Sequence, residues 1–138
     1  MNILIIFYSY SGNTKKVAEL VKEKLENQEV LLKNALTVTT AEIEQADTIL
    51  IGSPIHGYIL FGQKVCKEVK KVLEKKLPAD LKGKKVLLFA TYMFWPGKAL
   101  KKCSKVIEAK NGKILGLISD KAKQKENLAN QIVALTVH

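Results

Sequence analysis

Short runs of branched apolar residues recur along the chain, and most of them are separated by segments in which apolar residues repeat with helical spacing. The runs occupy residues 2–7, 29–32, 48–51, 86–90 and 114–118. Continuous apolar runs of this length are typical of strands that are buried on both faces of a parallel sheet. The pattern therefore predicts five strands.

The segments between these runs have the periodicity of amphipathic helices. The first has apolar residues three and four positions apart among lysines and glutamates, which predicts a helix over residues 14–27. Similar spacing predicts a short, weaker helix over 41–45 and further helices over 65–73, 100–107 and 128–135. Alternating strands and helices with short connections are typical of an open parallel sheet covered by helices on both faces. We therefore expect an α/β fold in which residues 1–138 form a single domain.

The composition agrees with one globular domain. The chain has 138 residues, of which 47% are hydrophobic and 26% are charged. This balance is typical of folded proteins and excludes disorder as the main state. No apolar run approaches the roughly 20 residues that cross a bilayer, and the apolar start lacks the basic leader and cleavage site of a signal peptide. We therefore expect a cytoplasmic protein without a membrane span.

Cysteine and histidine are rare. The two cysteines, Cys66 and Cys103, are too few for a disulfide scaffold or a four-ligand zinc site, and the two histidines are His56 and His138. Each cysteine lies among apolar residues at helical spacing, so we expect both to be small core residues. We expect no metal site.

Charge is distributed unevenly along the chain. All 23 basic residues are lysines, and with 13 acidic residues the net charge is +10. Residues 1–62 carry −2, whereas residues 63–138 carry +12. Without arginine the chain has no guanidinium fork for bidentate contacts to guanine edges or phosphates, so we expect no sequence-specific nucleic-acid recognition. General attraction to phosphate is compatible with this composition.

Three segments that follow predicted strands hold most of the aromatic residues. They span residues 8–14, 53–62 and 91–97 and contain seven of the nine aromatic side chains. The carboxyl ends of parallel strands meet at one edge of a sheet, where ligands bind in folds of this class. Aromatic side chains gathered there indicate a surface that buries a flat organic ligand or a partner.

The first of these segments also has the polar groups of a phosphate site. Four small polar residues surround Gly12 directly before a predicted helix: Ser9, Ser11, Asn13 and Thr14. A helix N-terminus has unpaired N–H groups and a partial positive charge, so it suits an anion. In the alternative interpretation, Ser11 or Asn13 only caps the helix. The segment lacks the spacing of a Walker loop or of a dinucleotide fingerprint.

The sequence Ser9-Tyr10-Ser11-Gly12-Asn13-Thr14 resembles the phosphate-binding loop of the flavodoxins, S/T-x-S/T-G-x-T. Residues 52–58 and 90–97 fall where flavodoxins carry the two loops that sandwich the flavin ring. The resemblance covers nearly the whole chain in element order. It implies a flavodoxin-like three-layer sandwich, with a five-stranded parallel sheet in the order 2-1-3-4-5, and it implies FMN as a noncovalently bound cofactor.

The resemblance also implies which residues bind the phosphate. They are Ser9, Ser11, Asn13 and Thr14, which would act through hydroxyls, the amide and backbone N–H groups. Gly57 matches the loop glycine whose peptide turns on reduction, so that a carbonyl accepts a hydrogen bond from the flavin N5–H. Glycine tolerates both orientations of that peptide.

The flavin ring is expected between the other two segments. Tyr92 or Phe94 is expected to cover its outer face, and Trp95 is expected to stack on the ring, to face the core or to face a partner. His56 stands where some flavodoxins place a tryptophan on the inner face, and it either stacks there or faces solvent. The expected cofactor-binding residues are Ser9, Tyr10, Ser11, Gly12, Asn13, Thr14, Pro54, Ile55, His56, Gly57, Thr91, Tyr92, Phe94, Trp95 and Gly97.

Flavodoxins are usually acidic around the flavin, and this chain departs from that pattern. Residues 53–63 and 91–99 contain no aspartate or glutamate, whereas Lys15, Lys16 and Lys98 lie close by in the sequence. A nearby positive charge stabilises a reduced, anionic flavin. We therefore expect a less negative reduction potential for the second electron than in acidic relatives.

Lysines also follow the polar faces of two predicted helices in the second half of the chain. They are Lys64, Lys67, Lys70, Lys71, Lys75, Lys76, Lys98, Lys101, Lys102 and Lys105. Such faces are either simply solvated or able to steer an acidic redox partner to the protein.

The leading functional hypothesis is an FMN-binding electron-transfer protein that shuttles electrons between redox partners. One alternative is an FMN oxidoreductase of the same fold, of the quinone reductase or protoporphyrinogen oxidase type. A second alternative is a flavin-free protein-interaction module on the same fold. Turnover of NAD(P)H with a quinone would identify the enzyme, and a failure to bind FMN would identify the interaction module.

Overall fold

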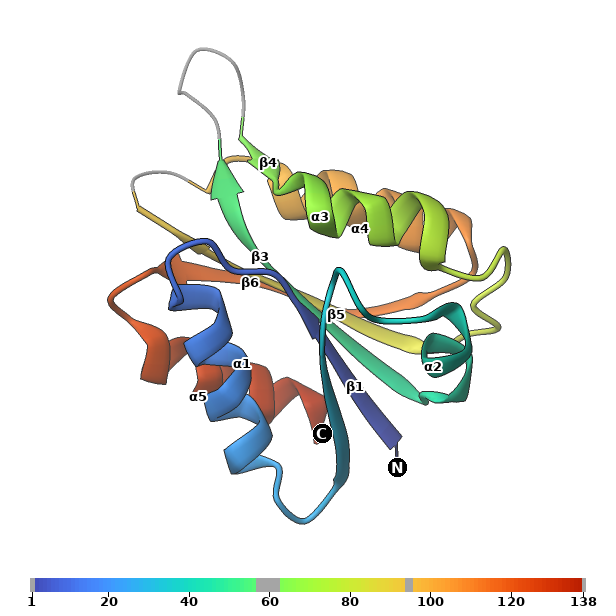
Figure 1. Cartoon of the computed structure of the whole chain (residues 1–138), viewed down its shortest axis with the longest axis horizontal. Coiled ribbons are helices and arrows are strands. Elements are labelled where there is room, and N and C mark those ends of the chain that lie inside the picture. Colours follow the sequence, from blue (N-terminus) through green and yellow to red (C-terminus); the bar gives the residue numbers. More distant parts are fainter. Residues whose placement is uncertain (1, 57–62, 94–95, 138) are drawn as a thin grey trace.

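The computed structural model describes residues 2–56, 63–93 and 96–137, which form a parallel sheet between two layers of helices (Figure 1). The strands are β1 (Asn2–Phe7), β2 (Glu29–Asn34), β3 (Thr48–His56), β4 (Lys64–Val65), β5 (Lys85–Tyr92) and β6 (Lys113–Lys121). The helices are α1 (Asn13–Lys24), α2 (Thr40–Gln45), α3 (Lys67–Lys71), α4 (Ala99–Ala109) and α5 (Lys125–Thr136), and a π-helical turn, Val72–Lys76, continues α3. Across the described part of the chain, none of the helices has the length and apolar content that crossing a membrane requires.

The strand order confirms the predicted topology. Hydrogen-bonded neighbours follow the order β2-β1-β3-β5-β6, all of them parallel, and the two-residue strand β4 pairs antiparallel with the end of β3. Without β4, this is the expected order 2-1-3-4-5. The chain reverses its direction of travel across the sheet after β2, so β1 and β3 lie at the centre and their carboxyl ends meet at one edge.

The continuous apolar runs arise because the sheet has a core on each face. Along β1, Leu4 and Ile6 belong to the core shared with α2, α3 and α4, while Ile3 and Ile5 belong to the core shared with α1 and α5. Side chains alternate between the two faces of a strand, so a strand that is covered on both faces needs apolar residues at every position. Figure 1 shows α3 and α4 on one side of the sheet and α1 and α5 on the other.

Four predicted strands, β2, β3, β5 and β6, prove longer than their apolar runs, and two of them reach into segments that we expected to be loops. β3 continues to His56 because its last two residues pair with β4, and β5 continues to Tyr92 because it stays paired with β6 as far as Lys121. Backbone pairing extends these strands, and apolar side chains do not encode it. Six residues that we expected in loops therefore lie on strands: Ser53, Pro54, Ile55, His56, Thr91 and Tyr92.

Helix boundaries also differ from the predicted ones. α1 ends at Lys24 rather than at residue 27, because the Leu25 N–H turns back to the carbonyls of Val21 and Lys22. The helix expected over 65–73 begins only at Lys67, since Val65 belongs to β4. The expectation of a helix at Val65 was wrong because its apolar side chain fits either element.

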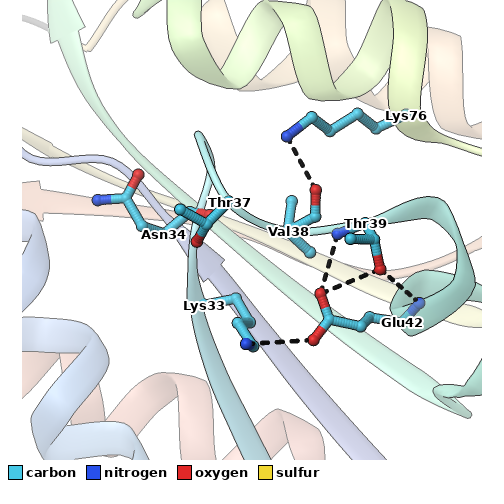
Figure 2. Close-up of polar contacts among 7 residues, drawn as sticks. All are labelled: Lys33, Asn34, Thr37, Val38, Thr39, Glu42 and Lys76. Carbon is cyan, nitrogen blue, oxygen red and sulfur yellow. Dashed lines mark hydrogen bonds and ion pairs between the residues drawn. The ribbon is translucent and has the colours of Figure 1, made fainter.

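The connection from β2 to α2 is held to the helix layer by a lysine (Figure 2). The Nζ atom of Lys76 donates to three backbone carbonyls of that connection, those of Ala35 (2.9 Å), Leu36 (3.2 Å) and Val38 (2.8 Å). Thr39 then forms a capping box with Glu42 at the start of α2, and the Glu42 carboxylate lies 3.3 Å from Lys33 Nζ. These contacts fasten the edge of the sheet to the end of the π-helical turn.

Candidate functional site

The segment between β1 and α1 leads into a helix start that no described side chain caps. Gly12 is the N-cap residue of α1 and has a φ of +95°, in the left-handed region that favours glycine. The Lys16 N–H makes the first helical hydrogen bond, to the Gly12 carbonyl at 2.9 Å, so the N–H groups of residues 13–15 precede it. The alternative in which Ser11 or Asn13 only caps α1 is therefore wrong.

The small polar side chains instead shape the turn before the helix. Ser9 Oγ accepts a hydrogen bond from the Gly12 N–H at 2.9 Å, and Ser11 Oγ accepts one from the Asn13 side-chain amide at 3.0 Å. Ser11 and Gly12 are exposed, so an anion can reach the helix start. A 12-residue helix with free N–H groups and a partial positive charge at this end fits a phosphate group.

Thr14 connects this turn to the end of β5. Its Oγ1 atom lies 2.8 Å from Oγ1 of Thr91, and both side chains are buried. The Thr14 hydroxyl therefore faces the interior next to β5. Two of the three expected segments thus share a direct hydrogen bond.

Tyr10 connects the same turn to the first turn of α3. Its hydroxyl donates to Glu68 Oε1 at 2.8 Å, and its ring makes an edge-to-face contact with Tyr8 at a centroid distance of 5.0 Å. The hydrogen bond to Glu68, followed by burial and the charge of Glu68, raises the pKa of Tyr10 to about 12. Burial raises the pKa of Glu68, but the hydrogen bond from Tyr10 and neighbouring lysines outweigh that effect and lower it overall.

Ser53 connects the carboxyl end of β3 to Cys66, the residue before α3. The Ser53 Oγ atom accepts the Cys66 N–H at 3.0 Å and lies 2.7 Å from the Pro54 carbonyl, to which it donates. Cys66 is buried, and burial raises the pKa of its thiol. Cys103 is buried in the same core, which confirms that both cysteines are core residues.

For three other expected site residues, the structure gives backbone contacts or backbone conformation. The His56 backbone pairs with Lys64, the Tyr92 carbonyl accepts the Ala122 N–H at 2.9 Å, and Gly97 lies in an exposed turn with a φ of +58° before α4. The expectations for Gly57, Phe94 and Trp95 lie outside the described residues.

A fourth segment, between β6 and α5, also adjoins the start of α1. A hollow of about 410 Å³ is lined by Asn13, Tyr92, Met93, Lys121, Ala122, Lys123 and Lys125. This segment contains no aromatic residue, so the pattern of aromatic residues did not indicate it. Its position after the last strand could have indicated it, since that strand ends at the same edge of the sheet as the others.

The comparisons with known proteins agree with this arrangement. The family model described as "Flavodoxin domain" matches residues 4–134. The flavodoxin of Aquifex aeolicus (strain VF5) is 44% identical over 55 residues, which are 38% of this chain and 30% of that protein. The flavodoxin of Maridesulfovibrio salexigens is 35% identical over 96 residues, which are 62% of this chain and 60% of that protein. The matched parts are thus less than two thirds of the length of either relative.

Solved structures show the same fold. The crystal structure of oxidised flavodoxin 2 from Bacillus cereus superimposes with a TM-score of 0.78 over 99% of both chains, at 21% sequence identity. Flavodoxins bind FMN, so the cofactor expected from the first loop is confirmed for the family. Since the family model covers nearly the whole chain, this protein belongs to the flavodoxin family.

Proposed function

We propose that this chain binds FMN at the carboxyl edge of its sheet and acts as an electron-transfer protein. The observation that carries the proposal is the start of α1, where Gly12 precedes N–H groups that no described side chain caps. This feature lies at the end of the central strand β1, beside the ends of β3 and β5, as a flavin site in this fold requires.

In this proposal the first segment holds the phosphate of FMN. The N–H groups of residues 13–15 donate to its oxygens, and the hydroxyls of Ser9 and Ser11 together with the Asn13 amide keep the turn open around it. Thr14 anchors the turn to β5 through Thr91. Tyr10 anchors it to α3 through Glu68.

The flavin ring then lies against the segments that follow β3 and β5. Pro54, Ile55 and Tyr92 lie at the described ends of these strands. Gly57 and the aromatic residues Phe94 and Trp95 are proposed to complete the ring site. Bound FMN supplies reversible one- and two-electron chemistry, and the protein orients the ring and sets the charge around it.

The proposal predicts a strong preference for FMN over riboflavin, which lacks the phosphate. Titration of the purified chain, followed by flavin fluorescence, should show FMN binding at least about tenfold more tightly, because hydrogen bonds to a charged group are among the strongest in proteins. Equal binding of both flavins would contradict the phosphate site. Failure of both to bind would favour the flavin-free interaction module.

Gly12 offers a sharper test with a matched control. Gly12 and Gly83 both have a positive φ, of +95° and +78°, and a Cβ atom at either position would meet nothing within 4 Å. Alanine should therefore strain the backbone by about 1–2 kcal/mol at either position. We expect Gly12→Ala to weaken FMN binding and leave riboflavin binding unchanged, whereas Gly83→Ala should change neither. An equal effect of the two substitutions would contradict the proposal.

A turnover assay distinguishes an electron carrier from an oxidoreductase with its own substrate. The FMN-loaded protein is mixed with NAD(P)H and a quinone, and consumption of NAD(P)H is followed by absorbance. A carrier should show no sustained turnover, but its flavin should reduce and reoxidise when an electron donor and an acceptor are added in turn. Sustained quinone reduction would instead support the oxidoreductase alternative.

A further inference from the structure

The basic charge of the molecule concentrates on one of its two helix layers. Residues 64–76 and 98–109, which include β4, α3 and α4, carry ten lysines and three glutamates. In the opposite layer, α1 and α5 carry five lysines and three glutamates. The excess of lysine therefore belongs to a particular face.

Two of the three glutamates in the basic layer reduce the charge of its surface little, and the third, Glu108, is exposed at the C-terminal end of α4. Glu68 is 8% exposed and accepts the hydrogen bond from Tyr10. Glu74 lies 3.8 Å from Lys70, and both side chains are more than half exposed, so this ion pair is weak. The surface is thus able to attract an acidic partner over a distance of about 10 Å.

A groove runs between α3 and α4 within this layer. Its volume is about 240 Å³, and its apolar lining comes from Val65, Leu73, Ala99, Cys103 and Val106. Three lysines, Lys64, Lys70 and Lys102, and one carboxylate, Glu74, also line it, so the charged lining carries a net positive charge. Figure 1 shows α3 and α4 next to each other, with β4 leading into α3. An apolar groove with lysines around it fits an acidic segment that inserts one apolar side chain.

The groove starts at the edge of the sheet that holds the candidate FMN site. Lys64 pairs with His56 at the carboxyl end of β3, and α3 contacts the first segment through the Glu68–Tyr10 hydrogen bond. A partner that occupies the groove would therefore lie beside that site. Electron transfer needs such proximity but no rigid or extensive interface.

We propose that the groove between α3 and α4 is the docking site for an acidic segment of a redox partner protein, which places an apolar side chain on Val65, Leu73 and Val106. The identification of the partner as a redox protein rests on the proposed function. A nucleic acid fits less well, because the chain has no arginine and none of the described residues lining the groove is an aromatic residue on which bases could stack.

The experiment uses the FMN-loaded 138-residue chain and two synthetic peptides. One peptide is rich in aspartate and glutamate with a central phenylalanine, and the other has serine in place of that phenylalanine. Binding is measured by calorimetry, and the site is mapped by amide shifts in two-dimensional NMR spectra. We expect the phenylalanine peptide to bind about tenfold more tightly, since its ring is removed from water. The largest shifts should fall at residues 64–74 and 99–106.

Matched charge variants test the lysines. The double variant Lys70→Gln/Lys102→Gln removes two charges at the groove, and Lys22→Gln/Lys113→Gln removes two charges from exposed positions on α1 and β6. We expect the first to weaken peptide binding about 2- to 30-fold, and the second to weaken it much less. Equal losses would show unspecific attraction and overturn the proposal.

Two further outcomes would also overturn it: equal binding of both peptides, and tighter binding of anionic lipid vesicles or of a single-stranded oligonucleotide than of the acidic peptide. FMN binding is measured on the same samples. If FMN binds and the peptide misses the groove, the docking proposal fails and the proposed function stands. If the peptide occupies the groove of a chain that binds no FMN, the groove stands as a docking site and the electron-transfer role fails.

Discussion

Thr14 at the start of α1 and Thr91 near the end of β5 share a hydrogen bond of 2.8 Å between their hydroxyl oxygens. Thr14 is 1% exposed and Thr91 is 3% exposed, so water cannot readily replace either partner. A buried hydroxyl that loses its partner destabilises a protein by about 1–3 kcal/mol. The pair therefore couples the turn proposed to hold the phosphate to the strand that leads into residues 93–97.

The substitution Thr91→Val tests this coupling. It should lower the free energy of unfolding by about 1–3 kcal/mol, because the Thr14 hydroxyl stays buried without its partner. It should also weaken FMN binding by roughly fivefold, the change that corresponds to about 1 kcal/mol. Urea denaturation and FMN titration measure the two effects.

Thr136 supplies the control for that prediction. It is also buried and donates to the Ile132 carbonyl at 2.7 Å, but it lies at the end of α5. Thr136→Val should lower stability without changing FMN binding. The double variant Thr14→Val/Thr91→Val should lose less stability than the sum of its single variants, since neither hydroxyl is left unpartnered. Strict additivity would show that the two hydroxyls do not stabilise each other.

Tyr10 should titrate unusually late. Its pKa is about 12, compared with an ordinary value of 10, because its hydroxyl donates to the Glu68 carboxylate. In a titration followed by phenolate absorbance, one of the four tyrosines should ionise near pH 12, and this component should be absent from Tyr10→Phe. Glu68→Ala should return the pKa of Tyr10 toward 10. If the late component persists in that variant, Glu68 is not its cause.

The same pKa sets the sign of a pH effect on stability. A group whose pKa is raised in the folded state stabilises the fold fully below its unfolded pKa and loses that contribution as the pH rises to the folded value. The stability difference between the wild-type chain and Tyr10→Phe should therefore be constant from about pH 6, where Glu68 is ionised, to about pH 10, and shrink between pH 10 and 12. A difference that grows over this interval would contradict the assignment.

The sheet could be predicted because the pattern that identifies each strand lies within a few consecutive residues. Apolar residues at consecutive positions, as in Ile3, Leu4 and Ile5, indicate that both faces of a strand are covered. This pattern can be recognised in a single sequence. The short strand β4 could not be predicted in this way. Lys64 and Val65 pair with the end of β3 through backbone atoms, which no pattern of side chains identifies.

For the candidate site, too, the local features could be predicted, but the contacts between distant residues could not. The glycine and small polar residues before α1 indicated the helix start, because left-handed backbone and free N–H groups depend on neighbouring residues. The contacts of Tyr10 with Glu68 and of Thr14 with Thr91 could not be found, since each joins residues that are 58 or 77 positions apart. Such pairs depend on how the layers pack.

Lys76 should matter for stability although it carries no part of the site. Its ammonium group donates to three backbone carbonyls of the β2–α2 connection, as Figure 2 shows for Val38. Lys76→Met removes these bonds and should lower the free energy of unfolding by about 1–3 kcal/mol. Lys75→Met is the control. Lys75 is exposed, and among the described residues its side chain makes no such hydrogen bonds to backbone carbonyls. Equal stabilities of the two variants in urea would contradict the role of Lys76.

Two lysines, one at the end of β6 and one just after it, should influence the charge around the proposed FMN site. Lys121 and Lys123 line the hollow beside Asn13 and Tyr92. A positive charge about 10 Å from a reduced, anionic flavin stabilises it by about 0.4 kcal/mol in water, or roughly 20 mV. Lys121→Gln/Lys123→Gln should therefore lower the reduction potential of the second electron by about 40 mV in an anaerobic redox titration. The wild-type potential should be less negative than that of acidic flavodoxins.

The control for this prediction is Lys22→Gln/Lys113→Gln, which removes the same net charge at exposed positions outside the hollow. Its shift should be much smaller, because charges farther than a Debye length of about 10 Å are largely screened at 0.1 M salt. Raising the ionic strength should also reduce the shift of the Lys121 and Lys123 variant. Equal shifts in the two double variants would mean that the potential depends on net charge alone. A strongly negative wild-type potential would mean that these lysines do not act on the flavin.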